Sequence, residues 1–541
     1  MEPTAKDLEV ERGAFRVDVC GHQFSVPAEQ AAASDMEKQL LQLLQPGTAR
    51  LRAQAAAATQ AGVSAIEALS SSALARLRRT RRRESTAAVD SPASRLFSDD
   101  DESWTADAAT GIVCSGLDVV ASAVGRGVSI ATCDKVVDGV ATLSIGGTVL
   151  GVLALARDDV LAPFASGVME SVAALMNRHA RMHADVRFAW TLLLAPGTVR
   201  VCLVEQDAMH VTRAQSLGSD GGRRLVASVV ALAGVGEAWR LGRDPTMRAY
   251  EGGWEITCPG DGTPRAVYAQ RDPVFAADTF FGRFTRCFLV ALDPGGSPDY
   301  VLKDSWQLVL VEEELNDEVC VLRRVTNALA GVECSGGVFQ RLVCGGTVRV
   351  NGDDDSSRLV LGGALDTYAR WTVAHGARRS AAAHRLHRRM VTGPVGMALH
   401  SLDSERDAVA AVAGAMVAHA SVLDHAATLH RDVSLGNVLA VRINGVIRGM
   451  LIDFDHAVDV DSLRNQRMPG HVGTAPFMSI SNLEGLDVPR TAADDWEAAL
   501  ALLLCLAARP LHRDALCARL AAVGSSSGVA EFRRDEFGCR Y

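Results

Sequence analysis

The sequence has few aromatic residues, no C-x-x-C pair and no long uninterrupted apolar segment, and each absence excludes a class of protein. Its twelve cysteines are scattered, which is typical of reduced thiols rather than of a disulfide framework or a zinc site. No apolar run reaches the roughly 18 residues of a membrane-spanning helix: 112–133 is interrupted by Asp118 and Arg126, and 498–508 is too short. The first residues, MEPTAKDLEVERG, lack the pattern of a secretory signal. We therefore expect a soluble intracellular protein, cytoplasmic or nuclear, without membrane contacts.

The composition indicates a folded chain of several parts. Hydrophobic residues make up 48% and charged residues 22% of the 541 residues, which excludes wholesale disorder. With 55 basic and 64 acidic residues the net charge is −9, so nucleic acid is an unlikely partner for the whole protein. Aromatic residues reach only 5%, and the many alanines indicate helices that pack through small side chains.

The first 103 residues read as a helical, partly disordered tail. Pro27–Leu44 is predicted to be an amphipathic helix, and Thr48–Arg83 continues as alanine-rich helix or coil. Six arginines lie within Arg76–Arg83 and an acidic run follows at Asp99–Glu102. The arginines are either a weak nuclear signal, a patch for an anionic partner or a solvated tail.

Residues 104–265 are predicted to form an α/β accessory domain. A helix is expected at Leu161–Met182, and strands are expected at Ala141–Ile145, Val149–Leu155, Thr191–Leu194 and Val199–Val204. This alternation favours a sheet covered on at least one face. No catalytic constellation occurs here, and we expect this front part of the chain to bind other proteins.

Residues 266–541 contain the candidate catalytic, metal-binding and nucleotide-binding residues. Strands are predicted at Phe280–Leu292, Tyr300–Trp306 and Arg385–Val391, and helices at Val311–Ala328 and Asp403–Leu429.

The clearest motif is His430-Arg-Asp-Val-Ser-Leu-Gly-Asn437, followed by Leu451-Ile-Asp-Phe-Asp455. Phosphoryl transfer to a hydroxyl needs a carboxylate that accepts the proton, and oxygen ligands that hold Mg²⁺ against the triphosphate. Asp432 is the candidate base, and Asn437 and Asp453 are the candidate metal ligands. Their joint order and spacing make the signal strong, although each residue alone is common.

Other residues are candidates for binding the phosphates of ATP. Lys303 is placed to bind the α- and β-phosphates of ATP, with Glu318 as its ion-pair partner and Glu314 as a rival. Gly282 and Thr285 are candidates for the phosphate-covering loop.

The remaining candidates surround the catalytic loop. His430 is expected to be structural, and Asp494 to brace the loop from a helix below it. Thr474 lies in Gly473–Met478, which resembles the end of an activation segment. If Arg431 binds an activating phosphate, Ser462 is the expected phosphorylation site, because no other hydroxyl residue lies between Asp455 and Gly473.

On these motifs, residues 270–510 resemble the fungal-type protein kinases, a divergent branch of the protein-kinase superfamily. The resemblance implies an α+β, two-lobed kinase fold, with a β-rich N-lobe at 266–402 and a shortened helical C-lobe at 403–541. It also implies ATP and Mg²⁺ as cofactors and protein serine or threonine as the phosphate acceptor. The protein substrate is not indicated.

The sequence departs from the common kinase pattern at several positions. The segment Gly282–Thr285 has one glycine where most kinases have three, and Asp455 replaces a glycine. Ser434 stands where many serine/threonine kinases have lysine. Ser481 stands where a glutamate usually closes the activation segment.

These departures leave two alternatives. A small-molecule phosphotransferase of the aminoglycoside or choline kinase type would explain Asp455, although Arg431 and Gly473–Met478 favour a protein kinase. An ATP-binding pseudokinase scaffold would explain the single glycine and the short C-terminal part, although the intact Lys303 and Asp432 count against it.

Overall fold

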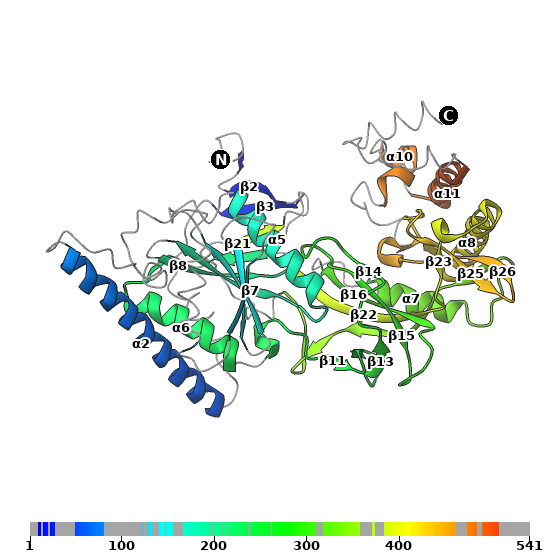
Figure 1. The fold of residues 1–541 in the computed structure, drawn as a ribbon. Coiled ribbons are helices and arrows are strands. Elements are labelled where there is room, and N and C mark those ends of the chain that lie inside the picture. Colours follow the sequence, from blue (N-terminus) through cyan, green and yellow to red (C-terminus); the bar gives the residue numbers. More distant parts are fainter. Residues whose placement is uncertain are drawn as a thin grey trace.

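The structure is a computed structural model, and it contains three larger β-sheets joined by helices (Figure 1). It describes residues 9–11, 14–19, 22–27, 49–80, 122, 128–132, 140–145, 148–154, 166–195, 198–206, 208–211, 214–235, 238–260, 262–309, 317–357, 370–373, 384–460, 473–483 and 490–507. Of the helix predicted at Pro27–Leu44, the structure describes only Pro27, which ends a strand; the acidic run, Glu314 and Ser462 lie outside the described residues.

The first sheet has eleven strands and is antiparallel except where β6 and β7 run parallel. Its path is β1-β2-β3-β21-β9-β8-β7-β6-β5-β4, with β10 paired to β8. The strands are β1 (Glu9–Glu11), β2 (Ala14–Val19), β3 (His22–Pro27), β4 (Val128–Thr132), β5 (Val140–Ile145), β6 (Thr148–Ala154), β7 (Ala189–Ala195), β8 (Thr198–Val204), β9 (Ala208–Val211), β10 (Gln215–Ser216) and β21 (Arg370–Val373).

Three helices accompany the first sheet: α2 (Ala49–Thr80), α5 (Ser166–Met182) and α6 (Asp220–Val235). Helix α5 makes the crossover that the parallel strands β6 and β7 require. Helices α2 and α6 lie side by side (Figure 1). Thr48–Arg83, predicted as helix or coil, is helical over its described residues, and the helix predicted at Leu161–Met182 is confirmed over Ser166–Met182.

The second sheet carries Lys303 and is antiparallel throughout. Its path is β11-β12-β13-β15-β16-β22-β18, with β14 paired to β15. The strands are β11 (Met247–Tyr250), β12 (Gly253–Cys258), β13 (Arg265–Ala269), β14 (Phe275–Ala276), β15 (Arg286–Ala291), β16 (Tyr300–Val309), β18 (Arg341–Thr347) and β22 (His384–Gly393). Helix α7 (Glu318–Ala328) packs against β18.

Two details of the second sheet differ from the sequence prediction. The strand predicted to start at Phe280 starts at Arg286, because Gly282 and Phe284 take positive φ angles, which an extended strand does not allow. The sheet also begins at β11, upstream of residue 266, where the kinase part was predicted to start. Helix α7 begins at Glu318 rather than at Val311, and residues 310–316 lie outside the described part.

The third sheet adjoins the two sequence motifs, which lie just before β25 and at the end of β26, and it follows the order β17-β26-β25-β23. Its strands are β17 (Gly337–Phe339), β23 (Met397–Ala398), β25 (Val438–Ile443) and β26 (Val446–Leu451). Helix α8 (Glu405–Ala426) crosses this sheet, and α11 (Ala492–Ala507) packs on α8. Smaller elements are β19 (Arg349–Val350) with β20 (Asp353–Asp354), β24 (Thr428–Leu429) with β27 (Val458–Asp459), α10 (Ile480–Leu483), and the 3-10 helices η2 (Ala238–Leu241), η3 (Leu399–Ser401), η4 (Phe454–His456) and η5 (Ala475–Phe477).

Small residues let α8 lie directly on the third sheet. A Cβ atom at Gly449 would come 1.7 Å from the carbonyl oxygen of Ala411, and one at Gly414 would come 2.0 Å from that of Gly336. Both distances are far inside van der Waals contact, so only glycine fits. This close approach is the small-side-chain packing that the alanine content predicts.

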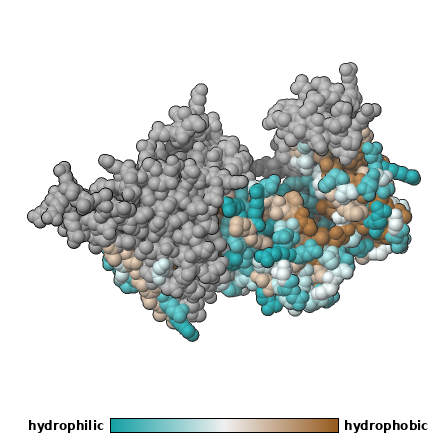
Figure 2. Space-filling view, viewed as in Figure 1, coloured by the Kyte–Doolittle hydropathy of each residue, from teal (hydrophilic) through white to brown (hydrophobic). Residues whose placement is uncertain are grey.

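Helix α8 is also apolar and long enough, by length and composition alone, to cross a membrane, but half of its most apolar window is buried within the protein. It serves here as the core helix over the third sheet. Figure 2 shows that apolar residues gather on the surface in this part of the molecule, where Val409, Val417 and Val446 are exposed.

Candidate active site

Lys303 and Glu318 form an ion pair between the second sheet and α7. Lys303 lies within β16, and its Nζ donates to Glu318 Oε2 at 2.7 Å. Glu318 is the first residue of α7, where the Asp317 side chain caps the helix by accepting from the Cys320 N–H at 3.0 Å. A carboxylate at a helix N-terminus is favoured by the helix dipole. The predicted pairing of Lys303 with Glu318 is therefore present in the structure.

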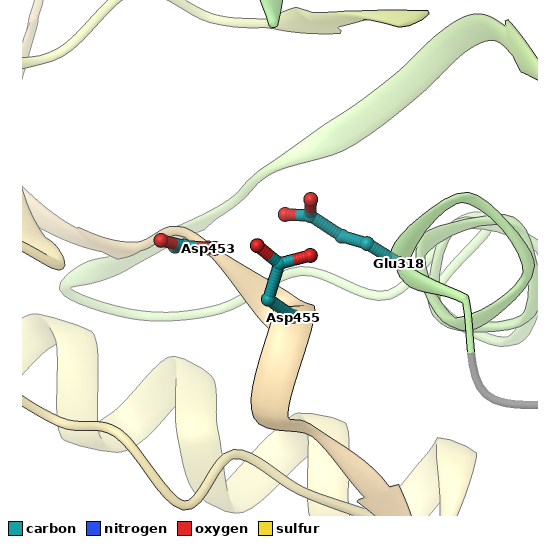
Figure 3. A group of neighbouring side chains, drawn as sticks. All are labelled: Glu318, Asp453 and Asp455. Atoms are coloured by element: carbon teal, nitrogen blue, oxygen red, sulfur yellow. The ribbon is translucent and has the colours of Figure 1, made fainter. Parts of the chain in front are cut away.

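Two aspartates that follow β26 complete the surroundings of Lys303. Its Nζ lies 2.7 Å from Asp453 Oδ1 and 3.1 Å from Asp455 Oδ2. Asp453 takes a left-handed backbone conformation with φ 66°, which turns the chain after the strand. The carboxylates of Glu318, Asp453 and Asp455 are neighbours (Figure 3), and one oxygen atom of each lies within 4.8 Å of one oxygen atom of the others.

Arg283 is a second cation in this cluster and was not predicted. Its guanidinium donates to Asp455 Oδ2 at 2.5 Å and contacts His456 Nε2 at 2.9 Å. The Gln307 side-chain amide donates to the other oxygen of Asp455 at 2.8 Å. Both oxygens of Asp455 therefore have protein partners, and this side chain anchors Lys303 and Arg283.

The electrostatics of the cluster favour a charged lysine. Burial would lower the pKa of Lys303, but Asp455, Glu318 and Asp453 outweigh it and hold that pKa well above its usual value. Burial and the Asp455 charge raise the pKa of Glu318. Burial would also raise the pKa of Asp455, yet Lys303 and Arg283 lower it. Three carboxyl groups thus face two cations, and the raised pKa of Glu318 means that this group takes up a proton more readily than a free glutamate does.

The catalytic loop is closed by hydrogen bonds around Asp432. The Asn437 side-chain amide donates to Asp432 Oδ2 at 2.8 Å and to the Asp432 carbonyl at 2.9 Å. Thr474 donates to Asp432 Oδ1 through its N–H at 2.7 Å and its hydroxyl at 2.8 Å. The loop and the segment that contains Thr474 therefore meet at the candidate base.

His430 is a buried structural residue in the structure, as the sequence predicts. Its Nε2 lies 3.0 Å from the Ile452 carbonyl, and its ring packs edge-on against Phe454 with centroids 4.8 Å apart. The Asp432 N–H donates to Nδ1 at 3.3 Å. Burial lowers the pKa of His430, and the neutral ring with hydrogen on Nε2 satisfies both contacts.

The carboxylate that braces the catalytic loop is Asp495, not Asp494. Asp495 is 2% exposed and accepts from the N–H groups of His430 (3.2 Å) and Arg431 (3.0 Å). Its Oδ2 also lies 2.8 Å from Nε2 of His419 on α8.

Asp494 points the other way. It accepts from the Thr491 N–H at 2.8 Å and the Ser479 hydroxyl at 2.5 Å, at the start of α11. The prediction missed by one residue because the two aspartates are adjacent, and only the rotation of α11 decides which one faces the loop.

Arg431 has a positive φ of 70° in the catalytic loop. Burial and the nearby Arg490 lower its pKa. Asp495 and Asp494 act in the opposite direction, and Arg490 forms an ion pair with Asp494 at 3.6 Å. Ser462, the predicted phosphorylation site, lies outside the described residues.

Gly282 and Thr285 do not form a free phosphate-binding loop in the structure. The Gly282 N–H donates to the Gln206 carbonyl at 2.8 Å, and the Thr285 carbonyl accepts from the Ala277 N–H at 2.8 Å. Phe284 is 4% exposed. Arg283 is the residue of this segment that reaches the catalytic cluster, so the predicted role of the Gly282 amide does not fit this geometry.

The residues at the predicted metal site fit Mg²⁺, which prefers oxygen ligands. Because the Asn437 amide nitrogen donates to Asp432, its side-chain oxygen remains for a cation. Asp453 is 33% exposed, so its carboxylate is accessible from solvent. These oxygen donors suit a hard divalent cation.

A comparison with protein-family models identifies the class of the chain. The model described as fungal protein kinase matches residues 168–506, which is more than half of the sequence. The chain therefore belongs to the fungal protein kinase family, as its motifs predict, and a kinase-like fold is compatible with its mixed helices and sheets. The match begins about a hundred residues before the predicted resemblance and includes α5 and β7 of the first sheet. A search of curated proteins found no match.

Proposed function

We propose that the protein is an ATP- and Mg²⁺-dependent protein kinase that transfers the γ-phosphate to serine or threonine of a protein substrate. Its second sheet with α7 would be the N-lobe, and the third sheet with α8 and α11 the C-lobe. The observation that carries the proposal is the position of Lys303, whose Nζ lies 2.7 Å from both Glu318 and Asp453. This arrangement brings the second sheet, with its lysine, next to the segment after β26, with its aspartate. Phosphoryl transfer by a kinase requires a lysine and a metal-binding aspartate close together.

The proposed reaction uses Asp432 as the base. The substrate hydroxyl would donate its proton to Asp432 as its oxygen bonds to the γ-phosphorus, and the bond between that phosphorus and the bridging oxygen to ADP would break. Asn437 and Thr474 hold the Asp432 carboxylate in a fixed orientation, because each donates to one of its oxygens. Such prior orientation lowers the entropic part of the barrier.

Lys303 would bind the α- and β-phosphates, and Asn437 and Asp453 would hold Mg²⁺. Bound Mg²⁺ supplies positive charge that offsets the charge of the phosphate oxygens. Glu318 keeps the lysine in place, since it is buried and also accepts from the Phe454 N–H at 3.1 Å.

The geometry favours a protein kinase over a small-molecule phosphotransferase. The latter would use Asp455 as a metal ligand, but Lys303, Arg283 and Gln307 occupy its oxygens. The contact of Thr474 with Asp432 supports the proposal, because a protein substrate would approach the proposed base beside the predicted activation segment. A pseudokinase is disfavoured because the Lys303–Glu318 pair is formed and Asp453 remains accessible.

The test is phosphate transfer from labelled MgATP to the protein itself and to a generic basic protein. Asp432→Asn should abolish the signal. Asp424→Asn, a change at an exposed aspartate of α8, should leave it unchanged. Equal labelling by wild type and Asp432→Asn would reveal a contaminating kinase and contradict the proposed base. Label on small alcohols but not on protein would favour the phosphotransferase, and MgATP binding without any transfer would favour the pseudokinase.

A further inference from the structure

The connection between β13 and β15, residues 270–285, is exposed over much of 271–278, but its later part, from Phe280 to Phe284, is folded against the protein. Phe280, Phe281 and Phe284 are all at most 4% exposed. The rings of Phe280 and Phe284 lie 4.8 Å apart. Buried aromatic side chains fix the path of a loop, because moving them would expose a large apolar area. This connection, which we call the β13–β15 loop, has a defined conformation next to the active site.

Residues that accompany the first sheet hold the β13–β15 loop through its backbone. The Phe280 N–H donates to the side-chain oxygen of Asn177, on α5, at 2.7 Å. The Gly282 N–H donates to the carbonyl of Gln206, just after β8, at 2.8 Å. Gln206 is fully buried, and its side-chain amide donates to the Arg187 carbonyl. The loop is therefore fastened at two points on either side of Phe281.

The held part of the β13–β15 loop is followed directly by Arg283, which contacts the cluster of Lys303, Glu318, Asp453 and Asp455. Arg283 follows Gly282, and its guanidinium contacts Asp455, which also binds Lys303. The Arg283 carbonyl accepts from the Trp306 N–H at 2.7 Å, three residues beyond Lys303 on β16. A shift of the loop at Phe280 would thus move a cation that lies beside Lys303.

A buried ionic network holds the first sheet in place relative to β16. Asp304, next to Lys303, accepts from Arg286, from Arg389 and from His387 at 2.7–2.9 Å. His387 bridges to Asp355 at 2.9 Å, and Asp355 pairs with Arg187, just before β7.

The network joins the part of the chain that precedes the second sheet to the strand of Lys303. Both ring nitrogens of His387 face carboxylates, so both must donate and the ring must be an imidazolium. Removing one partner of such buried charges is costly. The part of the chain that contains α5 and β7 is therefore rigidly joined to the strand of Lys303.

We propose that Asn177 is a positioning residue for nucleotide binding: by holding the Phe280 amide it sets the β13–β15 loop, and with it Arg283, over the phosphate groups of ATP. The part of the chain before the second sheet would thus contribute to the nucleotide site. This inference rests on the proposed function, because it takes MgATP as the ligand.

The test measures the Kd of MgATP and of adenosine by calorimetry on the full chain, for wild type and three variants. Asn177→Ala should raise the Kd of MgATP roughly tenfold, equivalent to about 1.4 kcal/mol. The Kd of adenosine should stay unchanged, because adenosine has no phosphates for the loop to face. Asn177→Asp keeps an oxygen acceptor and should restore most of the affinity. Met182→Ala, at an exposed position of the same helix, should match wild type.

Each outcome decides between the two proposals. Failure of the wild type to bind MgATP would refute the proposed function and this inference together. Binding by the wild type with an unchanged Kd in Asn177→Ala would refute this inference alone. An equal loss of MgATP and adenosine binding would also refute it, since this would mean a general disturbance of the structure. An Asn177→Asp variant as weak as Asn177→Ala would overturn the role of the oxygen acceptor.

Discussion

Replacing Asp495 by alanine should destabilise the protein far more than replacing its neighbour Asp494. Asp495 is 2% exposed and accepts from two backbone N–H groups of the catalytic loop, at His430 and Arg431, and contacts His419. Alanine would leave these buried groups without their acceptor. At about 1–3 kcal/mol for each unsatisfied donor, the loss should be about 3–5 kcal/mol of unfolding free energy, which is also the usual cost of breaking a buried pair.

Asp494→Ala is the matched control, because it makes the same aspartate-to-alanine change at the neighbouring position. Asp494 is partly exposed and accepts from Thr491 and Ser479 at the start of α11. Loss of such a cap costs about 1 kcal/mol. Asp495→Asn keeps one oxygen acceptor, so its free energy of unfolding should lie between those of the two alanine variants.

The assay is urea denaturation followed by tryptophan fluorescence, with the slope compared among variants so that changes in midpoint can be read as stability. The reasoning would be refuted by an Asp494→Ala variant at least as destabilised as Asp495→Ala. An Asp495→Ala variant within about 1 kcal/mol of wild type would refute it equally.

Two further predictions concern the buried charges and the close packing. Burial would lower the pKa of His387, but Asp304 and Asp355 outweigh it and raise that pKa above the usual 6.5; the stabilisation is full below pH 6.5 and is lost as the pH rises through the raised pKa. Wild-type thermal midpoints should therefore fall more steeply above pH 6.5 than those of His387→Gln, and parallel curves would contradict this. Gly449→Ala should lower unfolding free energy by about 1–3 kcal/mol or more, because its Cβ would overlap α8 backbone. Gly436→Ala, with no heavy atom within 4 Å of the added carbon, should change stability much less in the same urea titration.

The residues of the candidate site that could be predicted from the sequence are those in short motifs. Asp432, Asn437 and Asp453 stand at fixed spacings, so their proximity follows from a loop and a strand pair that are close in the chain. Glu318 could be predicted because a helix was expected to follow the strand of Lys303. In the structure Lys303 contacts Glu318 and Asp453, and Asn437 contacts Asp432.

The residues that could not be predicted have partners far away in the chain. Arg283 contacts Asp455 across 172 positions, and Asn177 contacts Phe280 across 103. No local pattern indicates such pairs, because a single arginine or asparagine is equally common on a solvated surface. The choice between Asp494 and Asp495 failed for a different reason, since it depends on the exact rotation of one helix.

Strand β22 carries charged residues that are buried rather than exposed to solvent. The segment His384-Arg-Leu-His-Arg-Arg389 reads as partly solvated, yet Arg385, His387 and Arg389 are at most 3% exposed. They alternate along the strand and so share one face of the sheet. That face is buried because carboxylates from distant segments, including Asp304 and Asp355, lie opposite it.

This buried ionic face makes the second sheet depend on residues that precede it in the chain. An apolar face could be covered by any apolar partner, whereas buried charges need particular partners at particular distances. Arg187, which precedes β7, and Asp244, which precedes β11, supply two of them, to Asp355 and Arg389. The second sheet would therefore keep unpaired buried charges without the residues before it. The family match, which begins at residue 168, includes both Arg187 and Asp244.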